Sequence, residues 1–138
     1  MLGQLPGTEA YRDIRRHPEA RTFAGLLIWR VGGDLFFAST GHMEAALNTS
    51  LAEIRPPIKH VLLDMSSVNF IDVSASDELI TFIKQLQSRG VTIAFAHVRD
   101  TVRQDMQLGK IEDVVGSVEF HERITDGVRA WQRQEPCS

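Results

Sequence analysis

The chain contains a single cysteine, Cys137, and this scarcity excludes two kinds of stabilisation. One cysteine can form no disulfide within the chain and cannot supply the several thiolates of a cysteine-based metal site, so a reducing compartment fits the composition best. The histidines are dispersed, and none of them is followed by another at the four-residue spacing of a zinc-binding helix. The sequence therefore predicts no metal centre.

Long hydrophobic runs are also missing. No uninterrupted apolar stretch approaches the roughly 18 to 20 residues that a membrane-spanning helix needs. The N-terminus lacks the basic-then-apolar layout of a signal peptide. We expect no membrane span within these 138 residues, whatever a longer parent protein contains.

Charge of one sign is not concentrated anywhere. The net charge is −3, and the only basic cluster is formed by Arg12, Arg15 and Arg16. Such interleaved charge does not favour nucleic acid as a partner.

The motifs of common enzyme sites are absent too. There is no glycine-rich phosphate loop of either usual spacing. Asp64 and Asp72 follow a predicted strand and could form a carboxylate pair, but no nucleophile, base and orienting residue can be assembled around them. We expect turn and capping roles for both aspartates, and we expect the protein not to be an enzyme.

What the chain does contain is the composition of one soluble domain, with 43% hydrophobic and 24% charged residues. Residues 1–22 include Pro6-Gly7 and His17-Pro18 and show no helical or strand periodicity, which predicts a solvated linker arm. We expect the folded domain to span residues 23–135.

The patterns after this arm predict alternating strands and helices. Apolar runs at Leu26–Trp29 and Leu35–Phe37 on either side of Gly32-Gly33 predict a β-hairpin. Thr40 is the expected N-cap of a helix that ends before Pro56. Further segments are predicted as a strand at Val61–Leu63, a helix from Ala75 to Leu86 that stops at Gly90, a strand at Val91–Ala96, a short helix around Val102 and Met106, a strand at Val118–Phe120, and a helix carrying Ile124, Val128 and Trp131. His60 and His97 flank the buried strands and are expected to be edge or core polar residues.

This order predicts the α/β class. We expect a mixed β-sheet of four to five strands with a parallel portion, an opening β-hairpin and about four to five flanking helices. Ser74 is the expected N-cap of the second helix, with Asp77 and Glu78 in its first turn. The exposed amides at this helix start could bind an anion or a partner, although the nearby acids would repel a phosphate.

The segment Val61–Ala75 resembles the signature of STAS domains, with a buried strand, an Asp, a short loop, a second Asp and a small hydroxylated pair opening a helix. That family includes anti-sigma-factor antagonists and the C-terminal domains of sulfate-permease (SulP) anion transporters. The segment Leu2–Ile14, with His17–Ala20 behind it, is similar to the stretch that joins the last membrane helix of a SulP transporter to its STAS domain. Leu26–Arg30 and Leu35–Ala38 likewise resemble the first two strands of the transporter branch.

The resemblance implies a regulatory and interaction domain of a bacterial sulfate or inorganic anion transporter, at the cytoplasmic face of the membrane. The implied contact region is the loop and helix start at Asp72, Val73, Ser74, Ala75 and Ser76. In the antagonists, the residue after the second Asp is a phosphorylated Ser or Thr, whereas Val73 stands there in this chain. The remaining candidates for phosphorylation in this segment are Ser74 and Ser76.

The partners implied are the transmembrane domain of the parent transporter, a second copy of the chain or another cytosolic protein. No cofactor is expected, although the resemblance permits a guanine nucleotide. The alternative is a freestanding partner-switch protein like the anti-sigma-factor antagonists, and both Val73 and the N-terminal arm argue against it.

Overall fold

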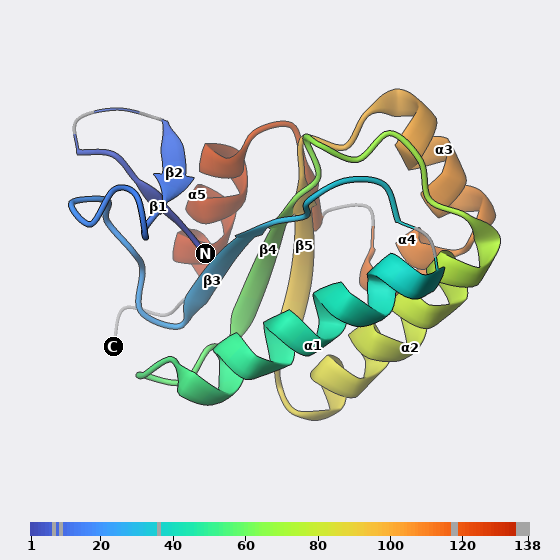
Figure 1. Ribbon diagram of the computed structural model, residues 1–138, viewed down its shortest axis with the longest axis horizontal. Coiled ribbons are helices and arrows are strands. Elements are labelled where there is room, and N and C mark those ends of the chain that lie inside the picture. The colour runs from blue at the N-terminus through green and yellow to red at the C-terminus, as the bar shows by residue number, and fades with distance from the viewer. Residues whose placement is uncertain (7, 9, 36, 117–118, 135–138) are drawn as a thin grey trace.

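The computed structural model describes residues 1–6, 8, 10–35, 37–116 and 119–134. The elements follow one another along the chain as β1 (Leu2–Gln4), β2 (Tyr11–Asp13), β3 (Leu26–Arg30), α1 (Phe37–Glu53), β4 (His60–Asp64), α2 (Val73–Ser88), β5 (Thr92–Ala96), α3 (Asp100–Leu108), α4 (Ile111–Val115), β6 (Phe120–His121) and α5 (Ile124–Gln134) (Figure 1).

The centre of the molecule is a sheet with the strand order β3-β4-β5-β6, in which every described pairing is parallel. All five residues of β4 are buried. A strand covered on both faces needs a continuous apolar run, and Val61–Leu63 supplies it. The expected α/β class with a parallel sheet and flanking helices is confirmed.

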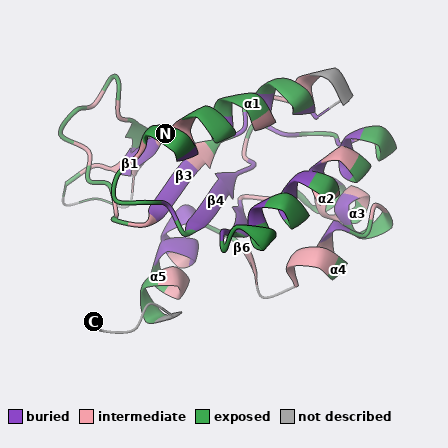
Figure 2. Ribbon diagram, turned by 90° about the horizontal axis from the view of Figure 1, so that it is seen from below, coloured by how far each residue is buried: buried purple, intermediate pink, exposed green. Residues whose placement is uncertain are grey.

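The sequential strand order explains which face each helix covers. Right-handed crossovers that always step in the same direction place their helices on one face of the sheet. Figure 2 shows α1 and α2 on one side of β3 and β4, and α5 on the other. The first core contains Leu63 and Phe95 together with residues of α1 to α4, and the second contains Leu62 and Ala94 together with residues of α5.

Small residues let α5 approach the second face closely. Ala94 and Ala96 of β5 are fully buried there beside Ile124 and Val128 of α5. A Cβ placed at Gly127 of α5 would lie 2.8 Å from both methyl carbons of Leu62. The helix therefore rests directly on the sheet because position 127 has no side chain.

The arm is folded. β1 and β2 form an antiparallel hairpin, with Leu2 opposite Asp13 and Gln4 opposite Tyr11. Leu2 and Tyr11 are each only 4% exposed and belong to the second core, so the arm is not a fully solvated connector. Strands of three residues are too short to show periodicity, which is why the sequence did not indicate them.

The opening hairpin was expected at the wrong place. The expected second strand is not found at Leu35 or Phe37, since Leu35 makes an isolated parallel bridge to Ile71 and α1 already begins at Phe37; Phe36 lies outside the described residues. Thr40 consequently lies inside α1 and is buried, and it does not cap the helix. The expected last strand begins at Phe120, and Val118 lies outside the described residues.

The stop of α2 was predicted correctly. Gly90 follows the helix with a φ of 80°, which only glycine adopts without steric cost. The strand after it, β5, confirms the predicted run that ends at Ala96, while α4 is a helix that no sequence pattern indicated.

Candidate functional site

The loop before α2 is fixed by backbone hydrogen bonds from a distant segment. The amide of Leu35 donates to the carbonyl of Phe70 at 2.9 Å, and the amide of Asp72 donates to the carbonyl of Leu35 at 3.1 Å. The amide of Asn69 donates to Oδ1 of Asp34 at 2.6 Å. Leu35, which the sequence predicted to be a strand residue, therefore holds this loop in place.

Asp72, and not Ser74, is the N-cap of α2. Its Oδ1 accepts a hydrogen bond from the amide of Ala75 at 2.7 Å, which satisfies one of the helix's unpaired amides. Ser74 is an exposed residue within the first turn. Because the helix begins at Val73, Asp77 and Glu78 lie beyond that turn, contrary to expectation.

The five residues singled out from the sequence divide between surface and core. Val73 is 77% exposed, and Ser74 is exposed beside it. Ala75 and Ser76 face inward and are 0% and 2% exposed. Of the two serines, Ser74 alone is accessible to a modifying enzyme.

The start of α2 packs against the end of α3. A Cβ placed at Gly109 would lie 2.7 Å from Cβ of Ser76, and the amide of Ile71 donates a long hydrogen bond of 3.5 Å to Oδ2 of Asp105. Position 109 must therefore be a glycine for the two helices to approach this closely.

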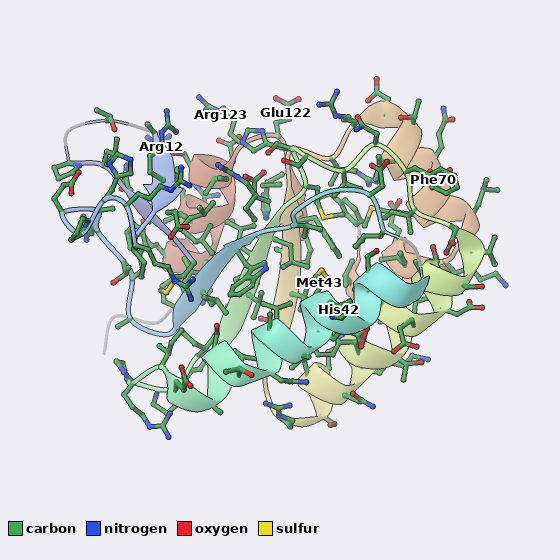
Figure 3. The ribbon with its side chains drawn as sticks, in the orientation of Figure 1. Arg12, His42, Met43, Phe70, Glu122 and Arg123 are labelled. Atoms are coloured by element: carbon green, nitrogen blue, oxygen red, sulfur yellow. The ribbon has the colours of Figure 1, made fainter. Side chains whose placement is uncertain are left out.

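Three large apolar side chains are exposed around this junction. Phe70 is 43% exposed, Val73 77% and Leu108 84%. We refer to these three residues as the tip surface, and Figure 3 shows Phe70 on the side of the molecule where α3 lies. The sequence indicated Val73 alone, because Phe70 and Leu108 come from a loop and a helix end whose proximity only the fold shows.

Asp64 and Asp72 do not form a carboxylate pair. Oδ2 of Asp64 accepts from Nε of Arg30 at 2.9 Å, and Oδ1 accepts from the amide of Ser66 at 3.0 Å. Asp64 is 1% exposed and holds the turn after β4, while Asp72 caps α2. The turn and capping roles predicted for both residues are confirmed.

A pair of glutamates lies between α1 and α2. Oε2 of Glu44 is buried and accepts no hydrogen bond from the described residues. Burial, and after it the neighbouring carboxyl of Glu78, raises the pKa of Glu44 to about 7. The two carboxyl groups can share a hydrogen bond only while one of them is protonated.

His60 is a buried polar residue of β4, as predicted for an edge or core histidine. Its Nδ1 contacts Oγ1 of Thr92 on the neighbouring strand. Burial, with a smaller effect of His121, lowers the pKa of His60 to about 4. His60 is therefore neutral at physiological pH, and its contact with Thr92 links two neighbouring strands of the sheet.

A cavity opens at the carboxyl ends of the parallel strands, about 230 Å³ in volume. Its walls come from residues 10–12 of the arm, from residues 123–125 at the start of α5, and from Arg30, Asp64, Ser66 and His97 at or just after the strand ends. Ligand sites of α/β domains commonly lie at this end of the strands. The sequence did not indicate this site because its arginines are far apart along the chain.

The fold defines a class of protein: an α/β domain with a parallel sheet covered by helices on both faces, in which α2 begins at an exposed tip. The STAS domain family model matches residues 17–127, and the chain belongs to the STAS domain family. Among the described residues, none of the helices is long and apolar enough to span a bilayer.

The curated relatives are transporters. The chain is 30% identical over 138 residues to the "Probable sulfate transporter 4.2" of Arabidopsis thaliana, covering 94% of this chain and 20% of that protein. It is 25% identical over 134 residues to a probable sulfate transporter of Mycobacterium tuberculosis, covering 97% of this chain and 24% of that protein. The chain thus spans about a fifth to a quarter of the length of the curated relatives it matches.

Solved structures share the fold. A murine Solute Carrier 26 family anion transporter in the inward-facing state matches with a TM-score of 0.83 at 21% identity, over 96% of this chain and 22% of that one. The STAS domain of a SulP transporter from Vibrio cholerae matches with a TM-score of 0.69 at 18% identity, over 88% of this chain and 91% of that one.

Proposed function

We propose that this chain is the cytoplasmic regulatory and interaction domain of a membrane anion transporter of the sulfate-permease type. In this proposal the membrane helices of the parent protein carry an inorganic anion such as sulfate. The STAS domain modulates transport through contacts with the transmembrane domain, a second subunit or another cytosolic protein.

The observation that carries the proposal is the extent of the likeness to sulfate transporters. Those relatives align over 94% and 97% of the chain, whereas the family model begins at residue 17. The alignments therefore reach into residues 1–16, which are part of the arm and include β1 and β2. A freestanding STAS protein has no need of such an arm, and it would also need a hydroxyl where Val73 stands.

The tip surface is the contact site that this proposal requires. Covering these three exposed apolar side chains with a partner is favourable, because binding removes their apolar surface from water. The neighbouring carboxylates of Asp72 and Asp77 favour a partner surface with an apolar centre and a basic rim.

Phosphorylation and nucleotide binding are secondary parts of the proposal. A phosphate on Ser74 would add about two negative charges beside Asp72 and Asp77, and it would weaken binding to an apolar partner. Ser76 is a poor acceptor, because it is 2% exposed and packs on Gly109. A guanine nucleotide would bind away from the tip, whose acids repel phosphate.

The test is protection of the tip surface in the complete protein encoded by the gene. Every native cysteine of that protein, Cys137 among them, is replaced by Ser, and Val73→Cys or Ala45→Cys is then introduced as the only thiol. Ala45 is exposed on α1, away from the tip, and is the matched control. A maleimide reagent should label both cysteines in the isolated chain, and only the one at position 45 in the membrane-embedded protein.

Equal labelling of the two cysteines in the complete protein would exclude the tip surface as the contact site. A reading frame without membrane spans upstream of this chain would remove the transporter proposal itself. Radiolabelled sulfate uptake with Phe70→Ser supplies the functional readout, and we expect altered uptake at unchanged protein level.

A further inference from the structure

The cavity at the carboxyl ends of β3, β4 and β5 is walled by cationic side chains from three separate elements. Arg12 comes from β2, Arg30 ends β3, and Arg123 precedes α5. Arg12 and Arg123 lie on the same side of the molecule, between the arm and the start of α5 (Figure 3). The fold alone brings these residues together, since more than 90 residues separate Arg30 from Arg123.

The acids near the cavity do not cancel this charge. Asp64 lines the cavity but uses one oxygen for Arg30 and the other for the amide of Ser66. Arg123 pairs with Asp126 at 3.2 Å. Arg12, Arg30 and Arg123 line the cavity, and Asp64 is the one carboxylate among its described lining residues, so the lining favours an anion in a partly enclosed site.

Hydrogen-bond donors are present beyond the ion pairs. Arg30 reaches Asp64 through Nε, so this ion pair does not use the two terminal nitrogens of its guanidinium group. The rim carries a further guanidinium, because Nη2 of Arg99 donates to the carbonyl of Ser66 at 3.1 Å. Ile124 and Thr125 also line the cavity, in the first turn of α5, where backbone amides have no partner within the helix.

The chemistry of this donor set selects a class of ligand. Guanidinium groups bind tetrahedral oxyanions such as sulfate and phosphate in a bidentate manner, and helix starts add amide donors. A cavity of about 230 Å³ admits a small oxyanion with some water, or the phosphate end of a larger molecule.

We propose that this cavity binds a tetrahedral oxyanion, and that the bound anion joins the arm to the sheet and to α5. Arg12 and Tyr11 are the arm's contribution, and the hydroxyl of Tyr11 is already within 3.5 Å of Oγ1 of Thr125. Occupancy of the cavity would hold the arm more firmly on the domain. The regulatory meaning rests on the proposed function, since the arm is the segment that leads to the parent's membrane helices.

The test is an NMR titration of the isotope-labelled chain with sodium sulfate at constant ionic strength, with sodium chloride as the balancing salt. We expect saturable shifts of the amides of Arg12, Ser66, His97 and Thr125, with a dissociation constant in the millimolar range or below. Constant ionic strength matters because added salt also screens surface charges and can shift amide signals without binding at a site.

Arg12→Gln is the decisive variant, because Arg12 is exposed and donates a hydrogen bond to the carbonyl of the adjacent Tyr11, so its loss should leave the fold intact. Losing one charge-assisted contact should weaken sulfate binding by about tenfold or more. Arg16→Gln removes the same charge from the same arm outside the cavity and should leave the affinity unchanged.

The same titration is repeated with inorganic phosphate and with guanosine diphosphate. Binding of sulfate and phosphate with similar affinity identifies a free oxyanion as the ligand, and much tighter binding of the nucleotide at the same amides identifies a nucleotide phosphate. Shifts that never saturate with any of the three, or an equal affinity in Arg12→Gln and wild type, would overturn the proposal. The thiol-labelling result at Val73 is independent of this outcome, so the two proposals fail separately.

Discussion

The glutamate pair between α1 and α2 makes a quantitative prediction about pH. The pKa of Glu44 is raised to about 7 in the folded chain, from an ordinary value of 4.5. Between these values the folded protein holds a proton that the unfolded chain has released. The stabilisation is therefore complete below pH 4.5 and is lost as the pH rises through 7.

The magnitude follows from the size of the shift. At about 1.4 kcal/mol per pKa unit, the full shift would correspond to roughly 3 kcal/mol. The carboxyl group keeps part of its contact with solvent, and screening reduces such effects, so we expect about 1 kcal/mol. Glu44→Gln removes the titrating group and keeps the shape of the side chain.

Urea denaturation of wild type and Glu44→Gln between pH 5 and pH 8 measures this difference. We expect the variant to gain about 1 kcal/mol relative to wild type over this range. Glu53→Gln, an exposed substitution in the same helix, should follow wild type. Parallel stability curves for wild type and Glu44→Gln would refute the reasoning.

The free energy of unfolding of the variant must be compared with that of wild type at each pH, because His60 changes the stability of both proteins in the opposite direction. Its pKa is lowered to about 4 from 6.5, so the unfolded chain binds the proton more readily. The stability that this buried neutral histidine contributes is present above pH 6.5 and is lost as the pH falls through about 4. Subtracting the two stability curves cancels this effect.

Three further substitutions test the packing and capping of α2 and the helix facing it. Gly109→Ala should destabilise the chain by about 1–3 kcal/mol, because the new Cβ meets Ser76; urea denaturation measures it, and an unchanged stability would contradict the close approach. Gly41→Ala, in α1 with no described atom outside the helix's own backbone within 4 Å of the new Cβ, should instead stabilise by up to about 1 kcal/mol, and a loss in thermal denaturation would be evidence against an open helix face. Asp72→Ala should cost about 1 kcal/mol through the lost bond to the amide of Ala75, while Asp72→Ser should retain most of the stability in the same assay.

Strands and helices with a clear local pattern of apolar residues could be predicted from the sequence. The buried run at Val61–Leu63 and the apolar stripe from Ala75 to Leu86 gave β4 and α2, and Gly90 marked the end of the latter. These predictions succeeded because burial on a face imposes a local period on the chain.

The remainder could not be predicted because it depends on contacts between distant segments. Leu35 resembles a strand residue and does make one bridge, but its partner is Ile71, far along the chain. The N-cap was placed two residues late because Ser74 and Asp72 are both good caps and only the backbone path chooses between them. The cavity at the strand ends could not be predicted, because the three arginines that line it are far apart in the sequence and only the fold brings them together.

The hairpin of the arm has a mechanical consequence. Leu2 and Tyr11 are anchored in the apolar layer between the sheet and α5, so the hairpin cannot be pulled away without exposing that layer to water. A force applied at Met1 would therefore move the hairpin and the central strands together. A flexible tether would absorb the same force, and the domain behind it would stay still.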